Sequence, residues 1–412
     1  MIGTAASRVP PTSPPLVYLD TQDYSRFGDV LRGKGDAKHE HLYRELLDRR
    51  DDGDVLFVYS MAILGELLQF SEEHAETTEC KARAIEQLCT DNVLIYPGRL
   101  VALEVARALY PEAADRSEPS ALAFSSSNYW YPNVADVFDG LKAQMQRQLT
   151  DEVGALGISG RTLKRAIKAN AKKLNLAKVA REAAPAVAEQ YGLPPAAVTQ
   201  SIVGVLEGRV SSEEASHVLF GAIARPTAFV EIYFRRYEGE KSLPLWISGV
   251  GANLQRLLEE LKAKLAPYTD NPQFRAFMET ELQNRRRGLG ATILALAASD
   301  LDEFGLNPTD LEVLKRDPDR AAQVPACLIV GEVMSAYASQ TTGIQGTGKI
   351  ERSFGGDLVH ALYLPHVSLW RGDRRFSHLV RSTLPHLSDG VVGRLADLPQ
   401  AIDKLNSSKA RE

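Results

Sequence analysis

The stretch SFGGDLVHALYLPHVSLWRGDRRFSHLV, residues 353–380, changes its hydrophobic period twice. Apolar residues recur at helical spacing in DLVHALYL, the short apolar run VSLW follows, and helical spacing resumes in RRFSHLV. This order of helix, strand and helix is typical of α/β domains with parallel strands. An acid stands on each side of the strand, with Asp357 at the start of the first helix and Asp373 just after VSLW.

The first quarter of the chain repeats this alternation. Apolar runs predict buried strands in LVYLD (16–20), DVLFVYS (54–60) and NVLIYP (92–97), with helical patterns between and after them. Near the other end, DGVVGRL (389–395) predicts a last short strand. Strands that alternate with helices predict an α/β fold with a central, mainly parallel sheet.

A block of helical patterns separates the two alternating segments, and Pro, Gly and Asn turns divide it. We therefore predict one discontinuous α/β domain, residues 16–118 and 322–406, interrupted by an all-α insertion, residues 119–321. Residues 1–15 are rich in Pro and Ser and lack an apolar segment, so they predict a flexible lead-in and not a signal peptide.

Composition limits the classes of function. A chain of 412 residues is longer than one typical domain, and a net charge of -5 argues against a wholly basic nucleic-acid coat. The three cysteines have no metal-binding or secretory spacing, and no apolar run is long enough to span a bilayer. These features predict a cytoplasmic protein with reduced thiols and no membrane contact.

Four acids stand where a parallel sheet would bring them together. Functional groups in open α/β sheets gather at the carboxyl ends of the strands. The acids in or near such positions are Asp20, Glu66, Asp357 and Asp373. Clustered carboxylates repel one another, and a hard divalent cation relieves that repulsion. Oxygen ligands suit Mg²⁺ or Mn²⁺, so the sequence predicts that these four acids hold one or two such ions.

Each acid also has a simpler structural interpretation. Asp20 and Asp357 could cap helices, and Asp373 could pair with Arg374 or Arg375 on the surface. Glu66 could lie on a solvated helix face, although its apolar neighbours favour the border of a cleft. Secondary candidates for the same region are Asp23, Glu104 and His360.

The local contexts of the four acids resemble those of the PIN-domain ribonucleases, a family that includes toxins of bacterial toxin–antitoxin pairs. The resemblance is carried by YLDTQDYSRF, YSMAILGELLQF, GGDLVHALYL and SLWRGDRRF. It gives Asp20, Glu66, Asp357 and Asp373 the places of the family's acids, Ser25 that of a hydroxyl, and Phe376 that of an aromatic. Gln22 replaces the usual Asn, and Gly372 stands where a Thr or Ser is usual.

The resemblance implies a PIN-like three-layer sandwich. It also implies a metal-dependent endoribonuclease in which a metal-bound water attacks the phosphodiester. It covers the first quarter and the last fifth of the chain and implies nothing about the helical insertion. Homodimers are common in the family.

Basic residues mark a predicted path for nucleic acid. Five of them share one face of a predicted helix in a segment without acids: Arg161, Lys164, Arg165, Lys168 and Lys172. A solvated face, or a surface for an acidic protein, would explain the same pattern. Beside the predicted metal site, Arg371, Arg374 and Arg375 would hold the scissile strand.

The sequence thus predicts a metal-dependent phosphodiesterase that cleaves RNA, with a protein regulator as a further candidate partner for the insertion. Two alternatives stay open at this point. One is a structure-selective DNA nuclease that uses the same acids, and the other is a PIN-like scaffold that binds RNA or protein without catalysis.

Overall fold

The structure is a computed structural model of the whole chain. It describes residues 14–68, 72–111, 123–125, 130–131, 184–185, 188, 195–221, 224–236, 242–345 and 348–409. The residues divide into two compact units, Met1–Tyr131 with Glu238–Glu412, and Pro132–Tyr237.

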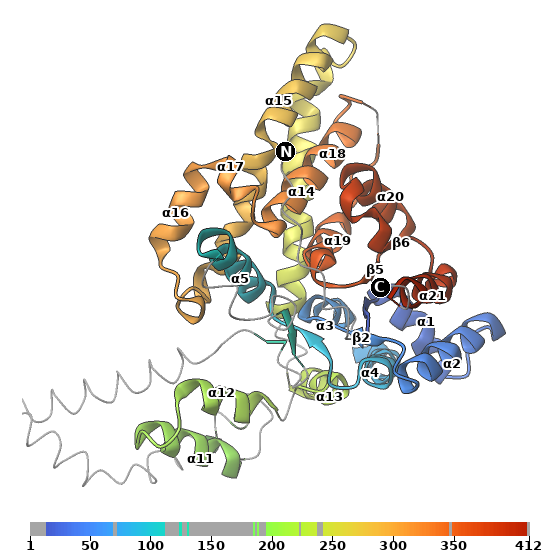
Figure 1. Cartoon of the computed structure of the whole chain (residues 1–412), viewed down its shortest axis with the longest axis vertical. Coiled ribbons are helices and arrows are strands. Elements are labelled where there is room, and N and C mark those ends of the chain that lie inside the picture. Colours follow the sequence, from blue (N-terminus) through green and yellow to red (C-terminus); the bar gives the residue numbers. More distant parts are fainter. Residues whose placement is uncertain are drawn as a thin grey trace, which may run out of the picture. The chain divides into compact units, whose positions relative to one another are not determined.

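The centre of the larger unit is a four-stranded parallel sheet with the strand order β2-β1-β5-β6 (Figure 1). Its strands are β1 (Leu16–Tyr18), β2 (Leu56–Val58), β5 (Leu369–Arg371) and β6 (Val391–Val392). Tyr18 lies opposite Trp370, so the two ends of the sequence pair with each other. Both residues are buried, because both faces of the sheet carry helices that exclude water.

A second, antiparallel pair of strands extends this arrangement. Its strands are β3 (Val93–Leu94) and β4 (Phe124–Ser125). A parallel bridge joins Tyr59 to Val93, so β3 lies beside the chain just after β2.

Helices connect the strands of the larger unit. Those before the smaller unit are α1 (Thr21–Leu31), α2 (Ala37–Asp51), α3 (Met61–Leu67), α4 (Ala75–Cys89) and α5 (Pro97–Leu109). Those after it are α14 (Ser242–Leu265), α15 (Pro272–Ala291), α16 (Pro308–Arg316), α17 (Pro318–Ala321), α18 (Pro325–Thr341), α19 (Phe354–Ala361), α20 (Arg374–Thr383) and α21 (Leu398–Lys409). Short 3₁₀ segments join several of them, of which Thr292–Ser299 is the longest.

The smaller unit is helical where it is described. It contains α11 (Pro195–Leu206), α12 (Ser212–Gly221) and α13 (Pro226–Arg236). Its apolar core includes Val198, Ile202, Val205 and Ala215, which come from α11 and α12. The helical spacing of these residues explains why the two helices pack together.

The smaller unit, Pro132–Tyr237, is shorter than the predicted insertion, residues 119–321. Residues 238–321 pack in the same unit as the sheet, because α14 contacts both α3 and α19 while α15 contacts α18. Amphipathic helices predict burial against something, but their spacing does not say which neighbour covers them. The two helices on which α14 packs carry Glu66 and Asp357, so α14 supports the region of the predicted site.

The predicted α/β fold agrees with this architecture at the level of class: a small parallel sheet within a mostly helical chain. Each of the five predicted strand segments overlaps an observed strand, and β4 was not predicted. All three cysteines are buried and free. Within the described ranges, no helix has the length and apolar character needed to cross a membrane.

Glycines let α15 and α18 approach closely (Figure 1). A Cβ atom on Gly290 would overlap the backbone carbonyl of Cys327, and one on Gly331 would overlap that of Arg286. The two helices therefore meet backbone to backbone at these positions. Gly288 lies in the same helix as Gly290 but has open space around its Cα.

Gly290→Ala is expected to lower the free energy of unfolding by about 1–3 kcal/mol, because a rigid backbone must move to admit the methyl group. Gly288→Ala is the matched control and is expected to raise it by about 0.5–1 kcal/mol, since alanine is the better helix former and meets no neighbour there. Urea unfolding of both variants measures the difference, and equal effects would contradict the close packing.

Candidate functional site

Two of the four predicted acids follow neighbouring parallel strands. Asp20 comes two residues after β1 and Asp373 two residues after β5. Each is the N-cap of the next helix: Asp20 Oδ1 accepts from the Gln22 amide at 3.3 Å, and Asp373 Oδ1 from the Arg375 amide at 2.6 Å. Because β1 and β5 are parallel and in register, both carboxylates lie at the carboxyl edge of the sheet.

The other two acids come from helices that contact each other. Glu66 lies in α3, which follows β2, and Asp357 lies in the first turn of α19. Both residues are partly buried. His360 is one turn further along α19, and its Nε2 lies 3.2 Å from Glu66 Oε2. An ion pair therefore joins the two helices beside the sheet.

The electrostatics show that the four carboxylates lie within reach of one another. Burial raises the pKa of Asp357 well above its usual range, and the charges of Asp373 and Asp20 raise it further. Burial and the charge of Glu66 likewise raise the pKa of Asp20. The negative charge of this edge is therefore only partly compensated by the cations around it.

His360 is one of these compensating groups. It is buried, with Nδ1 2.5 Å from the Tyr18 hydroxyl, which in turn lies 2.7 Å from Ser60 Oγ. Burial alone would lower the pKa of His360, but Glu66 together with the charges of Asp20 and Asp357 outweighs it and raises that pKa to about 9. For Glu66 burial also acts against the net shift, which is a lowered pKa caused by the charge of His360.

Arg371 is the second compensating group. It is buried at the end of β5, with Nη2 2.9 Å from Asp23 Oδ1 and Nη1 3.7 Å from Asp20 Oδ2. Arg26 Nη1 contacts the same Asp23 oxygen at 3.1 Å. The sequence predicted a contact between Arg371 and nucleic acid, but burial gives its guanidinium an internal role instead. One cation thus faces two acids at the start of α1.

Asp23 is the most buried acid of the region. Burial raises its pKa to about 7 in spite of the attraction of Arg371. Its second oxygen, Oδ2, has no hydrogen-bond partner among the described residues, and neither does Arg371 Nε. Buried polar atoms of this kind are usually satisfied by water or an ion.

The four acids fit a metal ion by the chemistry of their donor atoms but not by their arrangement. Across the described ranges, no group of three or more His, Cys, Asp or Glu side chains is arranged to hold an ion. The donor chemistry does fit a hard cation, because the acids offer only oxygen ligands and raise one another's pKa. Asp20, Glu66, Asp357 and Asp373 are therefore grouped by charge but not arranged as a closed coordination shell.

Other predicted residues have different environments. Arg374 and Arg375 are exposed at the start of α20, and Arg375 forms an ion pair with Glu351. Ser25 Oγ donates to the carbonyl of Thr21 in its own helix, at 3.1 Å. The predicted basic stripe, Arg161, Lys164, Arg165, Lys168 and Lys172, lies outside the described residues.

Glu104 is a structural residue. It is buried, with Oε2 accepting from the Ala326 amide at 2.7 Å and Oε1 2.6 Å from His366 Nε2. Glu104 itself belongs to α5, but its carboxylate lies beside the N-terminus of α18, where the helix dipole favours negative charge. The sequence offered Glu104 as a secondary candidate for the site, but its carboxylate makes these buried contacts instead.

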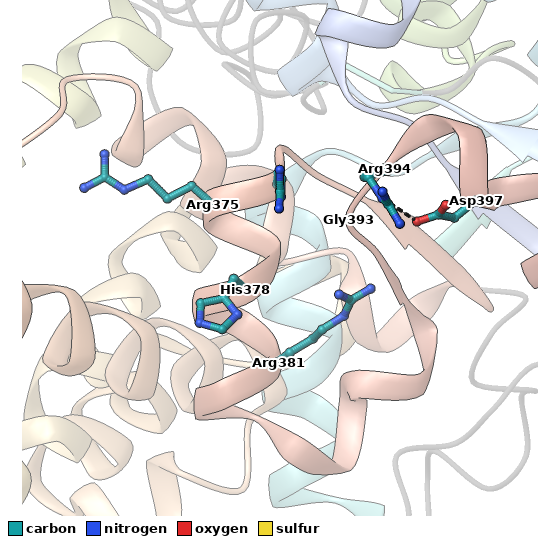
Figure 2. Close-up of a pocket in the computed structure, with 7 residues that line it drawn as sticks. Arg375, His378, Arg381, Gly393, Arg394 and Asp397 are labelled. Atoms are coloured by element: carbon teal, nitrogen blue, oxygen red, sulfur yellow. Dashed lines mark hydrogen bonds and ion pairs between the residues drawn. The ribbon is translucent and has the colours of Figure 1, made fainter.

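A basic pocket was missed by the sequence analysis. It has a volume of about 620 Å³ and lies between α20 and the segment that follows β6 (Figure 2). Its lining residues are Arg374, Arg375, His378, Arg381, Gly393, Arg394 and Asp397. Basic residues at positions 374, 378 and 381 share one helical face, which is the signal that could have predicted half of it.

No family model matches the chain, and comparison with curated proteins and with solved structures finds no match either.

His360→Gln is expected to lower the free energy of unfolding near pH 6 and to weaken its dependence on pH. The folded-state pKa of about 9 exceeds the usual 6.5, so the protonated imidazole contributes stability that is complete below about pH 6.5. That stability is lost as the pH rises through about 9, and it amounts to about 3 kcal/mol at most.

Urea unfolding across this pH range measures the effect. His41→Gln, an exposed position on α2, is the control and should behave like the wild type. Parallel pH curves for the wild type and His360→Gln would contradict the ion pair between His360 and Glu66.

Proposed function

We propose that this chain is a metal-dependent phosphodiesterase of PIN type, and most specifically an endoribonuclease. The observation that carries the proposal is the placement of Asp20, Glu66, Asp357 and Asp373 beside the carboxyl edge of a parallel sheet, where burial and then the charges of Asp373 and Asp20 raise the pKa of Asp357. Charge of this kind is costly for a fold unless it serves a ligand. The layered α/β architecture around the sheet supports a PIN-like sandwich.

In this proposal Asp20, Glu66, Asp357 and Asp373 would hold Mg²⁺ or Mn²⁺. The ion would activate a water molecule and neutralise charge on the phosphodiester. Two of its ligands start from fixed positions, because Asp20 and Asp373 are held by the amides of the helices that they cap.

The protein's own residues have separate parts in the reaction. Burial and the charges of Asp373 and Asp20 raise the pKa of Asp357, so a bound cation would keep its carboxylate ionised as a ligand. His360 holds Glu66 in place through the 3.2 Å ion pair, and Tyr18 orients the imidazole from the other side. Arg374, exposed beside Asp373, is available to hold the scissile strand.

RNA is preferred to DNA only through the PIN-like local sequences, so a DNA nuclease is the second candidate. A non-catalytic scaffold is less well supported, since it has no need for mutually repelling acids near a strand end. A protein regulator on the helical insertion and a homodimer remain part of the proposal.

Asp20→Asn and Asp373→Asn are each expected to reduce metal-dependent cleavage of a mixed single-stranded RNA pool by at least about a hundredfold. Asparagine caps helices as well as aspartate does, so the helices should persist while the charge is lost. Asp36→Asn is the matched control, because Asp36 caps α2 in the same way, through the His39 amide at 2.8 Å, away from the acid cluster.

Matched RNA and DNA oligonucleotides separate the two nuclease candidates. Loss of activity in Asp20→Asn and Asp373→Asn but not in Asp36→Asn would support the site. Activity that survives both substitutions would refute it.

Asp357→Asn is expected to raise the free energy of unfolding in metal-free buffer by about 1 kcal/mol, because it removes a carboxylate that its neighbours repel. Mn²⁺ at a hundred times its Kd should stabilise the wild type by about 2.7 kcal/mol and stabilise this variant far less. Asp389→Asn, an exposed position, is the control. Calorimetry that detects no Mn²⁺ binding to the wild type would favour the scaffold.

A further inference from the structure

The basic pocket lies at the same edge of the sheet as the acids. β1, β5 and β6 are parallel, so their carboxyl ends share one edge, in the order in which the strands pair. Asp20 follows β1, Asp373 follows β5, and Gly393 and Arg394 follow β6 directly. Along this edge the charge therefore changes from negative beside β1 and β5 to positive beside β6.

The positive charge of the pocket is only partly paired. It is lined by four arginines and one histidine, against a single carboxylate, that of Asp397. Arg394 Nε pairs with Asp397 Oδ2 at 3.0 Å, and Arg375 pairs with Glu351 outside the pocket. Among the described residues, neither Arg374 nor Arg381 has a carboxylate partner. The pocket therefore carries more positive than negative charge around its open volume.

The geometry of the pocket suits an anion with several oxygens. Arg381 and Arg394 approach the same space from facing elements, while Arg375 extends away from it (Figure 2). Arg381 is fixed by a hydrogen bond from Nη2 to the Val391 carbonyl at 2.6 Å, which leaves its other donors free to bind. Gly393 lies against the Arg381 guanidinium, and a side chain there would enter the space beside it.

Behind this glycine is a buried hydroxyl. The Cβ of Ser377 would lie 3.7 Å from a Cβ on Gly393. Ser377 is completely buried, and its Oγ has no hydrogen-bond partner among the described residues. Ser377 does not line the pocket, so it is the guanidinium groups lining it that favour an oxyanion as the occupant.

We propose that this pocket binds a backbone phosphate of the nucleic-acid strand, next to the phosphodiester at the acids. The proposal rests on the proposed function, which places the scissile phosphate at the acidic part of the edge. Arginine forks match phosphate oxygens, and the scarcity of apolar or aromatic lining residues favours phosphate over base recognition. The strand would then run along the edge of the sheet from β1 towards β6.

The proposal also gives α20 a double role. Its first residue follows Asp373, and the seven positions from Arg374 to Arg381 span about 10 Å along the helix. One helix thereby joins the acid cluster to the distal end of the pocket. With this arrangement the protein would bind the strand through a backbone phosphate on one side of the scissile bond, without recognising the base sequence.

Binding of a labelled single strand to the full chain, in EDTA so that no cleavage occurs, tests the proposal. The probe is a fluorescein-labelled RNA of about 20 nucleotides, longer than most single-strand binding sites, with the matching DNA as a second probe. The variant is the double substitution Arg381→Gln with Arg394→Gln, two pocket arginines that have no part at the acids, and both positions are exposed, so the fold should persist. Arg256→Gln is the control, an exposed arginine on α14 that pairs with Glu260 at 2.8 Å.

We expect the double variant to raise Kd about tenfold or more. The slope of log K against log salt should also become shallower by about 0.7 for each phosphate that is no longer neutralised. The control should match the wild type in both quantities. An unchanged Kd, or a raised Kd with an unchanged slope, would overturn the proposal, the second because it indicates a structural effect.

Failure of the pocket proposal and failure of the proposed function give different results. If inorganic phosphate binds the pocket but neither strand does, the site takes free anions and the strand proposal fails. If strands bind through the pocket while the wild type shows no metal-dependent cleavage, the phosphate site stands and the proposed function fails. If cleavage occurs but the double variant binds normally, the proposed function stands and the pocket proposal fails.

Discussion

The parallel pairing of β1 with β5 is the constraint on which the rest of the larger unit depends. It joins Tyr18 to Trp370, residues from opposite ends of the sequence, and it fixes which groups lie at the carboxyl edge. A shift of one residue in this register would turn every side chain of one strand to the opposite face. This pairing places Asp20 and Asp373 at the same edge of the sheet, and this edge is also where the helices that they cap, α1 and α20, begin.

Charge balance at this edge decides how the surrounding residues are used. Arg371 is buried against Asp23 and near Asp20, and His360 is buried against Glu66, so each cation offsets particular acids. Within the described part of the chain, neither Asp357 nor Asp373 forms an ion pair of this kind. The uncompensated part of the charge therefore lies between α19 and the start of α20, beside a pocket of opposite sign. This separation of charge along one sheet edge links the acid cluster to the proposed path of the strand.

The hydrophobic pattern of the sequence predicted where the helices and strands lie, but it did not predict which of them pack together. All five apolar runs that were predicted as strands overlap an observed strand, because short buried strands have a distinct sequence pattern, while β4 was not predicted. The packing of α14 against α3 and α19 could not be predicted from sequence pattern, since an amphipathic face does not specify which element covers it. The same limit applies to the site. Strand ends suggested Asp20 and Asp373, but the burial of Arg371 and the pairing of His360 with Glu66 depend on contacts between distant segments.

Glu104 bears on the order in which the chain folds during synthesis. Its helix is otherwise apolar on the buried side, with Leu100, Val101 and Leu103, yet its carboxylate needs the Ala326 amide and His366. Those partners are translated 222 and 262 residues later. At about 5–20 residues per second, the ribosome takes roughly 10–50 s to supply them. Until then, burial of this face against another surface would leave the carboxylate without its partners, which is costly.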